Sequence, residues 1–173
     1  MSINNQFQNI QLKPIIDGAY FEETLGIIQR SQKRCLCSIF IVDHDLDNDK
    51  QQLVDQLLLA LSAASWRGVD TRLILGGSRS NQYIQETSLM AWERAKDLNI
   101  DVRLVAASKE NNSHVKLVVS DHAVVNGSHN WSGSMSGEQT QDSVVIESPA
   151  LANYLCHYFE TQWADTLETE YHV

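Results

Sequence analysis

Residues 57–75 read LLLALSAASWRGVDTRLIL, a helical pattern and a strand pattern on either side of one glycine. The first part is a leucine-rich segment, and the second part, residues 69–75, is short and rich in residues that favour a buried strand. Gly68 stands between them, where a glycine commonly ends a helix. The stretch therefore predicts a helix over 50–66, capped by Asp49, that is followed at once by a strand.

Helical and strand patterns alternate along the rest of the chain as well. Apolar residues at helical spacing predict helices over residues 20–33, 83–97 and 149–166. Short apolar runs predict strands over residues 35–42, 101–106 and 143–147. Strands separated by helices of this length favour βαβ units around a common sheet. We therefore expect an α/β fold with a mixed, mostly buried β-sheet flanked by helices on both faces.

Length and composition are typical of one soluble domain. The chain has 173 residues, 43% of them hydrophobic, which suits a single domain over residues 1–173. Residues 1–13 lack the apolar core of a signal peptide, and the longest near-apolar run, residues 57–64, is far shorter than a membrane span. Cys35 and Cys37 alternate along a predicted strand as small buried side chains do. We expect a soluble, cytoplasmic protein without a disulfide framework.

The charge of the chain is unevenly distributed. The formal net charge is −9; residues 1–116 carry all 13 lysines and arginines against 14 acidic residues, whereas residues 117–173 carry 8 acidic residues and no lysine or arginine. An acidic chain argues against a wide, nonspecific nucleic-acid groove, because affinity for a polyanion depends on many cationic contacts. A local basic site remains compatible with this charge. The acidic C-terminal part is typical of a solvated face.

The most informative chemical pattern lies in residues 111–134, which read NNSHVKLVVSDHAVVNGSHNWSGS. His114 and Lys116 are two apart on a predicted strand, so their side chains leave the same face about 7 Å apart at their bases. After a turn, a returning strand brings Ser128 and Asn130 back beside this pair. An imidazole, an ammonium, a hydroxyl and an amide would then converge, as donors to a tetrahedral phosphate do.

This pattern resembles the H-x-K-x4-D…G-S-x-N signature of the phospholipase D superfamily of phosphodiesterases. The matching residues are His114, Lys116, Asp121, Gly127, Ser128 and Asn130. The resemblance covers about residues 14–166 and implies the single-motif domain of that family. The family usually has six residues between the aspartate and the Gly-Ser pair, whereas this chain has five, residues 122–126. Because a slip of one residue moves side chains to the other face of a strand, the register of this shortened hairpin matters.

The resemblance also implies a two-step mechanism and a role for each residue. Neutral His114 would attack phosphorus and form a phosphohistidine. A second histidine would protonate the leaving oxygen and later deprotonate the incoming water. Lys116, Ser128 and Asn130 would hold the phosphoryl oxygens where negative charge develops. Asp142, where related sequences often have an acidic residue, would orient an imidazole through its ring N–H.

Three further residues of the pattern are expected to support the site. Asp121 would tie the hairpin together, Gly127 would permit a close approach of the backbone, and Trp131 would shape the pocket. The lysine already supplies positive charge, and the sequence has no H-E-x-x-H, C-x-x-C or paired-carboxylate cage beside the motif. We therefore expect a reaction without a metal or another cofactor.

Other conspicuous residues have simpler interpretations. His122 is expected in a solvated turn, and His129 takes the variable position of the motif and points away from its neighbours. The approximate spacing of a calcium-binding loop is shared by Asp43, Asp45, Asp47 and Asp49. This segment lacks the required glycine and the final glutamate, so we expect a strand-to-helix loop. The tryptophans expected in the core are Trp66, Trp92 and Trp163.

The resemblance suggests a substrate and an assembly. Short single-motif members resemble endonucleases, so the first hypothesis is a metal-independent nuclease that cleaves DNA or RNA. The alternatives are a phospholipase or other lipid phosphodiesterase, and a catalytically silent module that binds phosphate or nucleic acid. No basic amphipathic helix is evident, so no stable membrane association is expected. Because the mechanism needs two histidines and the chain has one H-x-K, we expect a homodimer whose shared active site contains His114 of both chains.

Overall fold

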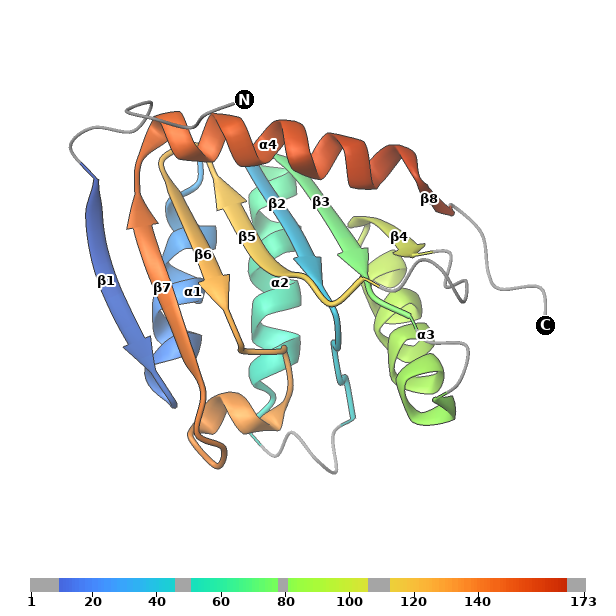
Figure 1. The fold of residues 1–173 in the computed structure, drawn as a ribbon. Coiled ribbons are helices and arrows are strands. Elements are labelled where there is room, and N and C mark those ends of the chain that lie inside the picture. The colour runs from blue at the N-terminus through green and yellow to red at the C-terminus, as the bar shows by residue number, and fades with distance from the viewer. Residues whose placement is uncertain (1–9, 46–50, 78–80, 106–112, 168–173) are drawn as a thin grey trace.

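The computed structural model describes residues 10–45, 51–77, 81–105 and 113–167 (Figure 1). They form an eight-stranded sheet in the order β1-β7-β6-β5-β2-β3-β4-β8. The strands are β1 (Gln11–Ile16), β2 (Arg34–Ile39), β3 (Asp70–Leu75), β4 (Asp101–Val105), β5 (Lys116–Ser120), β6 (Ala123–Gly127), β7 (Asp142–Glu147) and β8 (Thr166–Leu167). The helices are α1 (Ala19–Arg30), α2 (Leu53–Trp66), α3 (Gln82–Asp97) and α4 (Pro149–Ala164), and a 3-10 helix, η1, covers Gly133–Ser136.

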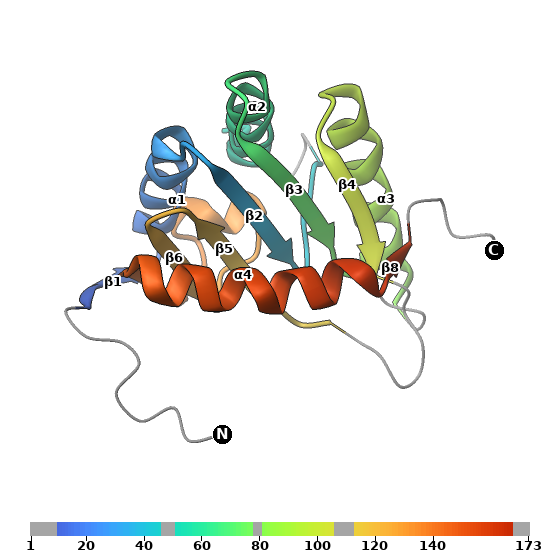
Figure 2. The same cartoon turned by 90° about the horizontal axis from the view of Figure 1, so that it is seen from above.

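Helices cover both faces of the sheet. Figure 2 shows α1, α2 and α3 on one face and α4 lying across the other. The neighbours β2, β3 and β4 are parallel, because a helix on one face connects each strand to the next. All other neighbouring pairs are antiparallel, so the sheet is mixed. This arrangement confirms the predicted fold class.

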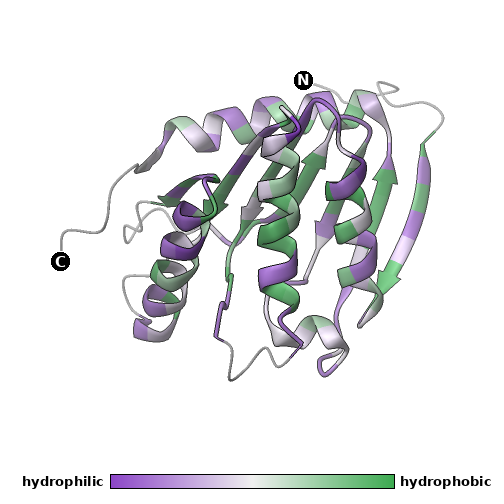
Figure 3. Cartoon of the chain, turned by 180° about the vertical axis from the view of Figure 1, so that it is seen from behind, coloured by the Kyte–Doolittle hydropathy of each residue, from purple (hydrophilic) through white to green (hydrophobic). Residues whose placement is uncertain are grey.

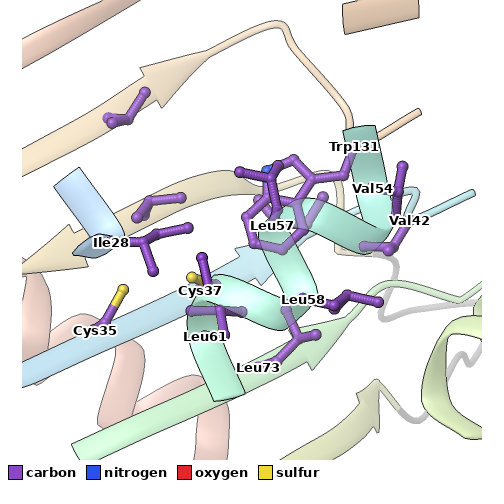
Figure 4. Packing of buried hydrophobic residues seen from close by; sticks show 14 of the residues in the cluster. Ile28, Cys35, Cys37, Val42, Val54, Leu57, Leu58, Leu61, Leu73 and Trp131 are labelled. Carbon is purple, nitrogen blue, oxygen red and sulfur yellow. The ribbon is translucent and has the colours of Figure 1, made fainter. Parts of the chain in front are cut away.

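The larger core lies between the sheet and the three helices α1 to α3. Leu57, Leu58 and Leu61 of α2 are fully buried in one cluster with Cys35 and Cys37 of β2, and Figure 4 shows Leu61 beside Cys37. Leucines three and four positions apart lie on one side of a helix, which explains why this part of α2 packs on the sheet. Figure 3 shows that the central strands and much of α2 are hydrophobic.

A smaller core lies under α4. Phe159 and Trp163 of this helix pack with Leu36, Val119 and Val124 from the central strands. Side chains alternate between the two faces of a strand, so β5 sends Val119 toward α4 and its neighbour Val118 into the larger core. The central strands are therefore covered on both faces, as continuous apolar runs predict.

Several element ends differ from the sequence prediction. β1 was missed because it is an edge strand with little burial, and its Leu12 is 65% exposed. Pro14, which has no N–H to donate, is tolerated in this strand because β1 has a neighbouring strand on one side only. α4 ends at Ala164, and the next residues form β8 instead of a further helical turn. α2 begins at Leu53, and its predicted cap Asp49 lies outside the described residues, as do residue 106 and the loop 108–112.

The tryptophans occupy three different environments. Trp163 is buried and Trp92 packs half-buried against the larger core, but Trp66 is 80% exposed. The prediction for Trp66 was therefore wrong. Its position is seven residues after the exposed Leu59, so both lie on the outer side of α2. None of the described helices has the length and the apolar character needed to span a membrane.

Candidate functional site

The residues of the motif gather mainly where the central strands end or begin, on one side of the sheet. We call this row of strand ends the site edge. β2, β3 and β6 end there, and β5 and β7 begin there (Figure 1). The hairpin between β5 and β6 turns through Asp121 and His122, and Val118 lies opposite Val125 in a regular antiparallel register. Two residues earlier in β5, this register brings Lys116 level with Gly127, the end of β6. The shortened hairpin therefore closes without a bulge and keeps the alternation of its side chains.

His114 and Lys116 both lie against the ring of Phe40. Nζ of Lys116 donates to Nδ1 of His114 at 3.1 Å and to the carbonyl oxygen of the same residue at 3.1 Å. The centroid of the Phe40 ring is 4.4 Å from that of the imidazole and 5.0 Å from Nζ. An ammonium at this distance is attracted to the face of the ring. His114 lies two residues before Lys116, the first residue of β5, and is exposed, whereas Lys116 is only 8% exposed.

Burial and charge favour the neutral imidazole at this position. Partial burial, followed by the charge of Lys116, lowers the pKa of His114 below its usual value of 6.5. Burial also lowers the pKa of Lys116 below its usual value of 10.5, because loss of water disfavours the charged form. An ammonium can only donate, so Nδ1 of the neutral His114 accepts and the ring proton lies on Nε2.

Gly127 is the last residue of β6, and Ser128 follows it and lies beside Asp142, the first residue of β7. A Cβ atom at Gly127 would lie 2.4 Å from the Cα of Ser143, which is far too close, so only glycine fits. The Ser128 N–H donates to the carbonyl oxygen of Asp142 at 2.8 Å. The Ser128 hydroxyl donates to the same oxygen at 3.0 Å and accepts from the Asp142 N–H at 3.0 Å. The hydroxyl is thus engaged with the backbone of β7.

Asp142 and Ser128 lie side by side through these backbone bonds. The side chain of Asp142 is exposed. Within the described part of the chain, its carboxylate makes no hydrogen bond to an imidazole. Its charge acts on the imidazole of His129, but not detectably on that of His114, so the orienting role of Asp142 toward an imidazole of the site stays a prediction.

Asn130 is oriented by the segment that follows β2. Its Oδ1 accepts from the N–H of Ile41 at 3.3 Å, which leaves the two N–H groups of the amide without an acceptor among the described residues. Ile41 directly follows Phe40, the residue that supports His114 and Lys116. One short segment therefore contacts three of the predicted catalytic side chains.

Trp131 belongs to the core and fixes the backbone of the site. Its N–H donates to the carbonyl oxygen of Ile41 at 3.0 Å, and its own carbonyl accepts from the N–H of Asp43 at 2.8 Å. The ring is fully buried, and Nε1 donates to the hydroxyl of Tyr20 at 3.1 Å. Trp131, which directly follows Asn130, is thus bonded through its main chain to the segment that contains Phe40 and Ile41, and its ring lies away from the surface.

Asp121 does not reach the site edge, because it occupies the hairpin turn at the other end of β5. Its Oδ1 accepts from the N–H groups of Gln32 at 2.9 Å and Lys33 at 3.2 Å. Burial raises the pKa of Asp121, but backbone hydrogen bonds outweigh burial and lower it below the usual value of 3.8. The carboxylate therefore ties the hairpin turn to the turn between α1 and β2.

An open cavity of about 1000 Å³ lies at this opposite edge. Its charged lining is mixed in sign and consists of Arg30, Arg67, Asp121, His122 and Glu147. His122 is about one third exposed, and its ring nitrogen Nδ1 lies 3.3 Å from the hydroxyl of Ser120. This cavity is thus separated from the site edge by the length of β5.

His129 is buried between the sheet and α1. Its Nδ1 lies 2.8 Å from the hydroxyl of Ser143, and its Nε2 lies 3.1 Å from the carbonyl oxygen of Asp17. The ring stacks on Tyr20 with 4.4 Å between centroids. Burial lowers the pKa of His129 below 6.5, although Asp17 and, after it, Asp142 act in the opposite direction. His129 therefore points away from His114 and Lys116 and toward α1, although it follows the end of β6 and lies outside the strand.

Sequence reasoning missed Phe40 and Ile41 as parts of the site. The apolar run 35–42 reads as one continuous strand, but β2 ends at Ile39, and Val42 pairs with Trp131 instead of β3. A usable signal was the length of this run, which exceeds that of the strands beside it.

The described residues contain no group of three or more histidine, cysteine or acidic side chains that is placed to hold a metal ion.

The expected strand-to-helix loop with its four aspartates is described only in part. Asp43 is 4% exposed, and its Oδ2 accepts from the hydroxyl of Tyr83 at 2.5 Å. Asp47 and Asp49 lie outside the described residues. Asp43 is therefore held in a contact between this loop and α3.

Comparisons with known proteins point to one family. Residues 25–163 match a family model described as cardiolipin synthase, PLD-like domain. No curated protein sequence matches the chain. Among solved structures, Nuc of Salmonella typhimurium, a phospholipase D family member, is 20% identical with a TM-score of 0.72, covering 92% of this chain and 97% of its own.

Two further structures share the fold. NucT from Helicobacter pylori is 14% identical with a TM-score of 0.67, and the match covers 92% of this chain and 99% of NucT. Phosphatidylserine synthase of Haemophilus influenzae is 13% identical with a TM-score of 0.64, and the match covers 87% of this chain and 36% of the synthase. The family model covers most of the present sequence, and the chain therefore belongs to the phospholipase D superfamily as a phospholipase D-like domain.

Proposed function

We propose that this protein is a metal-independent phosphodiesterase that acts through a phosphohistidine and cleaves DNA or RNA. The observation that carries this proposal is the pairing of His114 with Lys116 on the ring of Phe40, beside the amide of Asn130. A nucleophile, a cation and two N–H donors at one edge are the groups that phosphoryl transfer requires.

In the first step, Nε2 of His114 attacks phosphorus, and the bond from phosphorus to the leaving oxygen breaks. A second imidazole, which starts protonated, gives its proton to that oxygen and becomes neutral. In the second step, this imidazole takes a proton from water, the water oxygen attacks phosphorus, and the phosphorus–nitrogen bond breaks. The two steps return the protein to its starting state.

Attack by Nε2 requires the ring proton to move from Nε2 to Nδ1. In the structure, Nδ1 is occupied by the ammonium of Lys116. A bound phosphodiester would draw this ammonium to its oxygens, because a charged acceptor competes strongly with a neutral imidazole. Nδ1–H could then donate to a carboxylate, and Asp142 is the residue that we assign to orienting an imidazole.

The phosphoryl oxygens are assigned to Lys116, Asn130 and Ser128. The Asn130 amide fits this role, because its oxygen is held by Ile41 and its N–H groups are available. Ser128 must exchange its bond to the carbonyl oxygen of Asp142 for a bond to substrate. Its N–H remains bonded to the same carbonyl, so the residue itself need not move.

The second imidazole is assigned to another copy of the chain in a symmetric homodimer. His44 also lies near the site edge, but its Nε2 is 3.1 Å from Oδ1 of Asp55, which accepts from Arg94 as well. The remaining described histidines lie in the opposite turn, in the core and on α4; they are His122, His129 and His157. A dimer in which two copies of His114 face each other meets the need of the reaction.

Turnover with a small diester tests the chemistry. We expect hydrolysis of bis(p-nitrophenyl) phosphate to persist in excess chelator, since Lys116 supplies the positive charge. His114→Ala should abolish turnover, and Lys116→Ala should lower it by several orders of magnitude by removing charge stabilisation. His122→Ala is the matched control, because His122 lies at the opposite edge. Complete loss in chelator with recovery on adding a divalent ion would refute the metal-independent scheme.

Substrate class is tested with fluorescent single-stranded and double-stranded oligonucleotides beside phosphatidylcholine vesicles. Nuclease activity is supported by the likeness in fold to Nuc and NucT, and the likeness to a phosphatidylserine synthase makes lipid the necessary comparison. Cleavage of oligonucleotides is the expected result. Cleavage of lipid alone would refute the nuclease, and binding without cleavage would identify a silent module.

The shared site is tested by sedimentation and by mixing subunits. The protein should sediment as a dimer at micromolar concentration. After subunit exchange with a roughly ninefold excess of His114→Ala chains, activity per wild-type chain should fall to about a tenth, because few dimers then contain two wild-type copies. A monomer with activity per chain that does not change on dilution would refute the dimer.

A further inference from the structure

Tyr83 presents an exposed aromatic ring near the site edge. It lies in the first turn of α3, which follows β3, and β3 ends at that edge (Figure 1). Half of its surface is exposed. The other exposed aromatic residues of the described chain lie on the last turn of α2 and on α4; they are Trp66, Tyr154 and Tyr158. α2 begins near the site edge and ends at the opposite one, so Trp66 is remote.

The ring is held in place by its hydroxyl group. Oη donates to Oδ2 of Asp43 at 2.5 Å, and the N–H of Asp43 donates to the carbonyl oxygen of Trp131 at 2.8 Å. Oδ1 of this buried carboxylate has no hydrogen-bond partner among the described residues, so Tyr83 is its main support. A ring fixed at one end loses little further freedom when a flat group stacks on it.

The surroundings of Tyr83 favour an uncharged, flat ligand. The bond to Asp43, followed by burial, raises the pKa of Tyr83 to about 12, and Asp45 adds to the rise. Two carboxylates near the hydroxyl repel a phosphate group. A nucleobase carries no charge, and each base offers a π-face that stacks on an aromatic ring. In a duplex these faces are covered by neighbouring base pairs, whereas a single strand exposes them.

We propose that Tyr83 is a base-stacking subsite for a single strand of nucleic acid bound along the site edge. This inference rests on the proposed nuclease function and adds the substrate class. A strand whose phosphodiester lies at His114 would set a base outside the scissile bond on Tyr83. Contact through the base face lets an acidic protein hold the strand without a row of cationic residues.

The test measures binding in a His114→Ala background, so that no substrate is cleaved. The probes are a fluorescent single strand of DNA, the same sequence in RNA, and a fully abasic DNA strand of equal length. Tyr83→Phe and Tyr83→Leu form a matched pair, because both lose the bond to Asp43 and only the first keeps a ring. Tyr158→Ala is the control, since this tyrosine on α4 is 45% exposed.

We expect Tyr83→Leu to bind the base-containing strands roughly tenfold or more weakly than Tyr83→Phe, the usual worth of one stacked base. The two variants should bind the abasic strand equally, and Tyr158→Ala should bind like the parent protein. Equal affinity of the pair for base-containing strands, or an equal loss for the abasic strand, would overturn the subsite. Hydrolysis of bis(p-nitrophenyl) phosphate by the wild type without binding of any oligonucleotide would overturn it while sparing the phosphodiesterase chemistry.

Discussion

Replacement of Gly127 by alanine is expected to force β6 away from β7 at the site edge. The added Cβ would lie 2.2 Å from Oγ of Ser143, 2.4 Å from Cα of Ser143 and 2.5 Å from the carbonyl oxygen of Asp142. Oγ could rotate away, but the other two atoms belong to the backbone. The strands must therefore separate by about 1 Å to reach the roughly 3.5 Å at which non-bonded carbon atoms pack.

This separation should affect both stability and turnover. Overpacking costs about 1–3 kcal/mol in the free energy of unfolding. The same movement stretches the 2.8 Å bond from the Ser128 N–H to the carbonyl oxygen of Asp142. A displacement of about 1 Å can lower a reaction rate roughly a hundredfold. We therefore expect Gly127→Ala to unfold at lower urea concentration and to lose about two orders of magnitude in kcat.

Gly26→Ala provides a matched control in a different setting. Gly26 lies within α1, and an added Cβ there would meet only the end of the Arg30 side chain, at 3.0 Å. Alanine is favoured over glycine in a helix interior by roughly 1 kcal/mol, so this variant should be more stable, with unchanged kcat. Urea unfolding and turnover of bis(p-nitrophenyl) phosphate measure both effects. A Gly127→Ala protein with wild-type stability and turnover would refute the close-approach argument.

Three further predictions concern single side chains. Asn130→Asp keeps an oxygen that accepts from the Ile41 N–H, but it replaces the two N–H donors by a second oxygen that repels phosphate. The value of kcat/KM should therefore fall about a hundredfold, and an unchanged kcat/KM would show that Asn130 is not part of the site. Phe40→Leu removes the ring that supports His114, so kcat should fall about tenfold with little change in KM; a change confined to KM would contradict this role. Because burial lowers the pKa of His129, the unfolded chain binds more protons, and stability should be complete above pH 6.5 and decline below it. Urea unfolding from pH 5 to 8 should show a shallower decline for His129→Gln, and an equal slope would contradict the assignment.

Sequence periodicity predicted the fold well where an element is buried on one side, as in α2, or on both, as in β5. Leu57 and Leu61 mark the inner side of α2, and Val118 and Val119 mark the two faces of β5. Periodicity failed for β1, because an edge strand buries little and Leu12 remains exposed. Such a strand is formed by pairing with β7, a contact that no local pattern encodes.

The spacing of the motif predicted where the reactive side chains lie, but not which residues hold them in place. His114 and Lys116 were predicted to lie together, and their nitrogen atoms are 3.1 Å apart. Phe40 was missed, because it lies more than seventy residues before His114 in the chain and no local pattern shows that the two side chains meet. Asp121 could be assigned to the hairpin but not to its partners in the α1–β2 turn, for the same reason.

The hydrogen bond from Ile41 to Asn130 joins residues that are 89 positions apart. Closing so long a loop has a large entropic cost before any contact can repay it, which makes such contacts late events in folding. The neighbouring bonds of Trp131 with Ile41 and Asp43 span nearly the same distance along the chain. The part of the site that Asn130 and Trp131 complete therefore forms only after residue 131 has been made, and a nascent chain that ends before residue 130 lacks the bonds that tie this segment to Ile41 and Asp43.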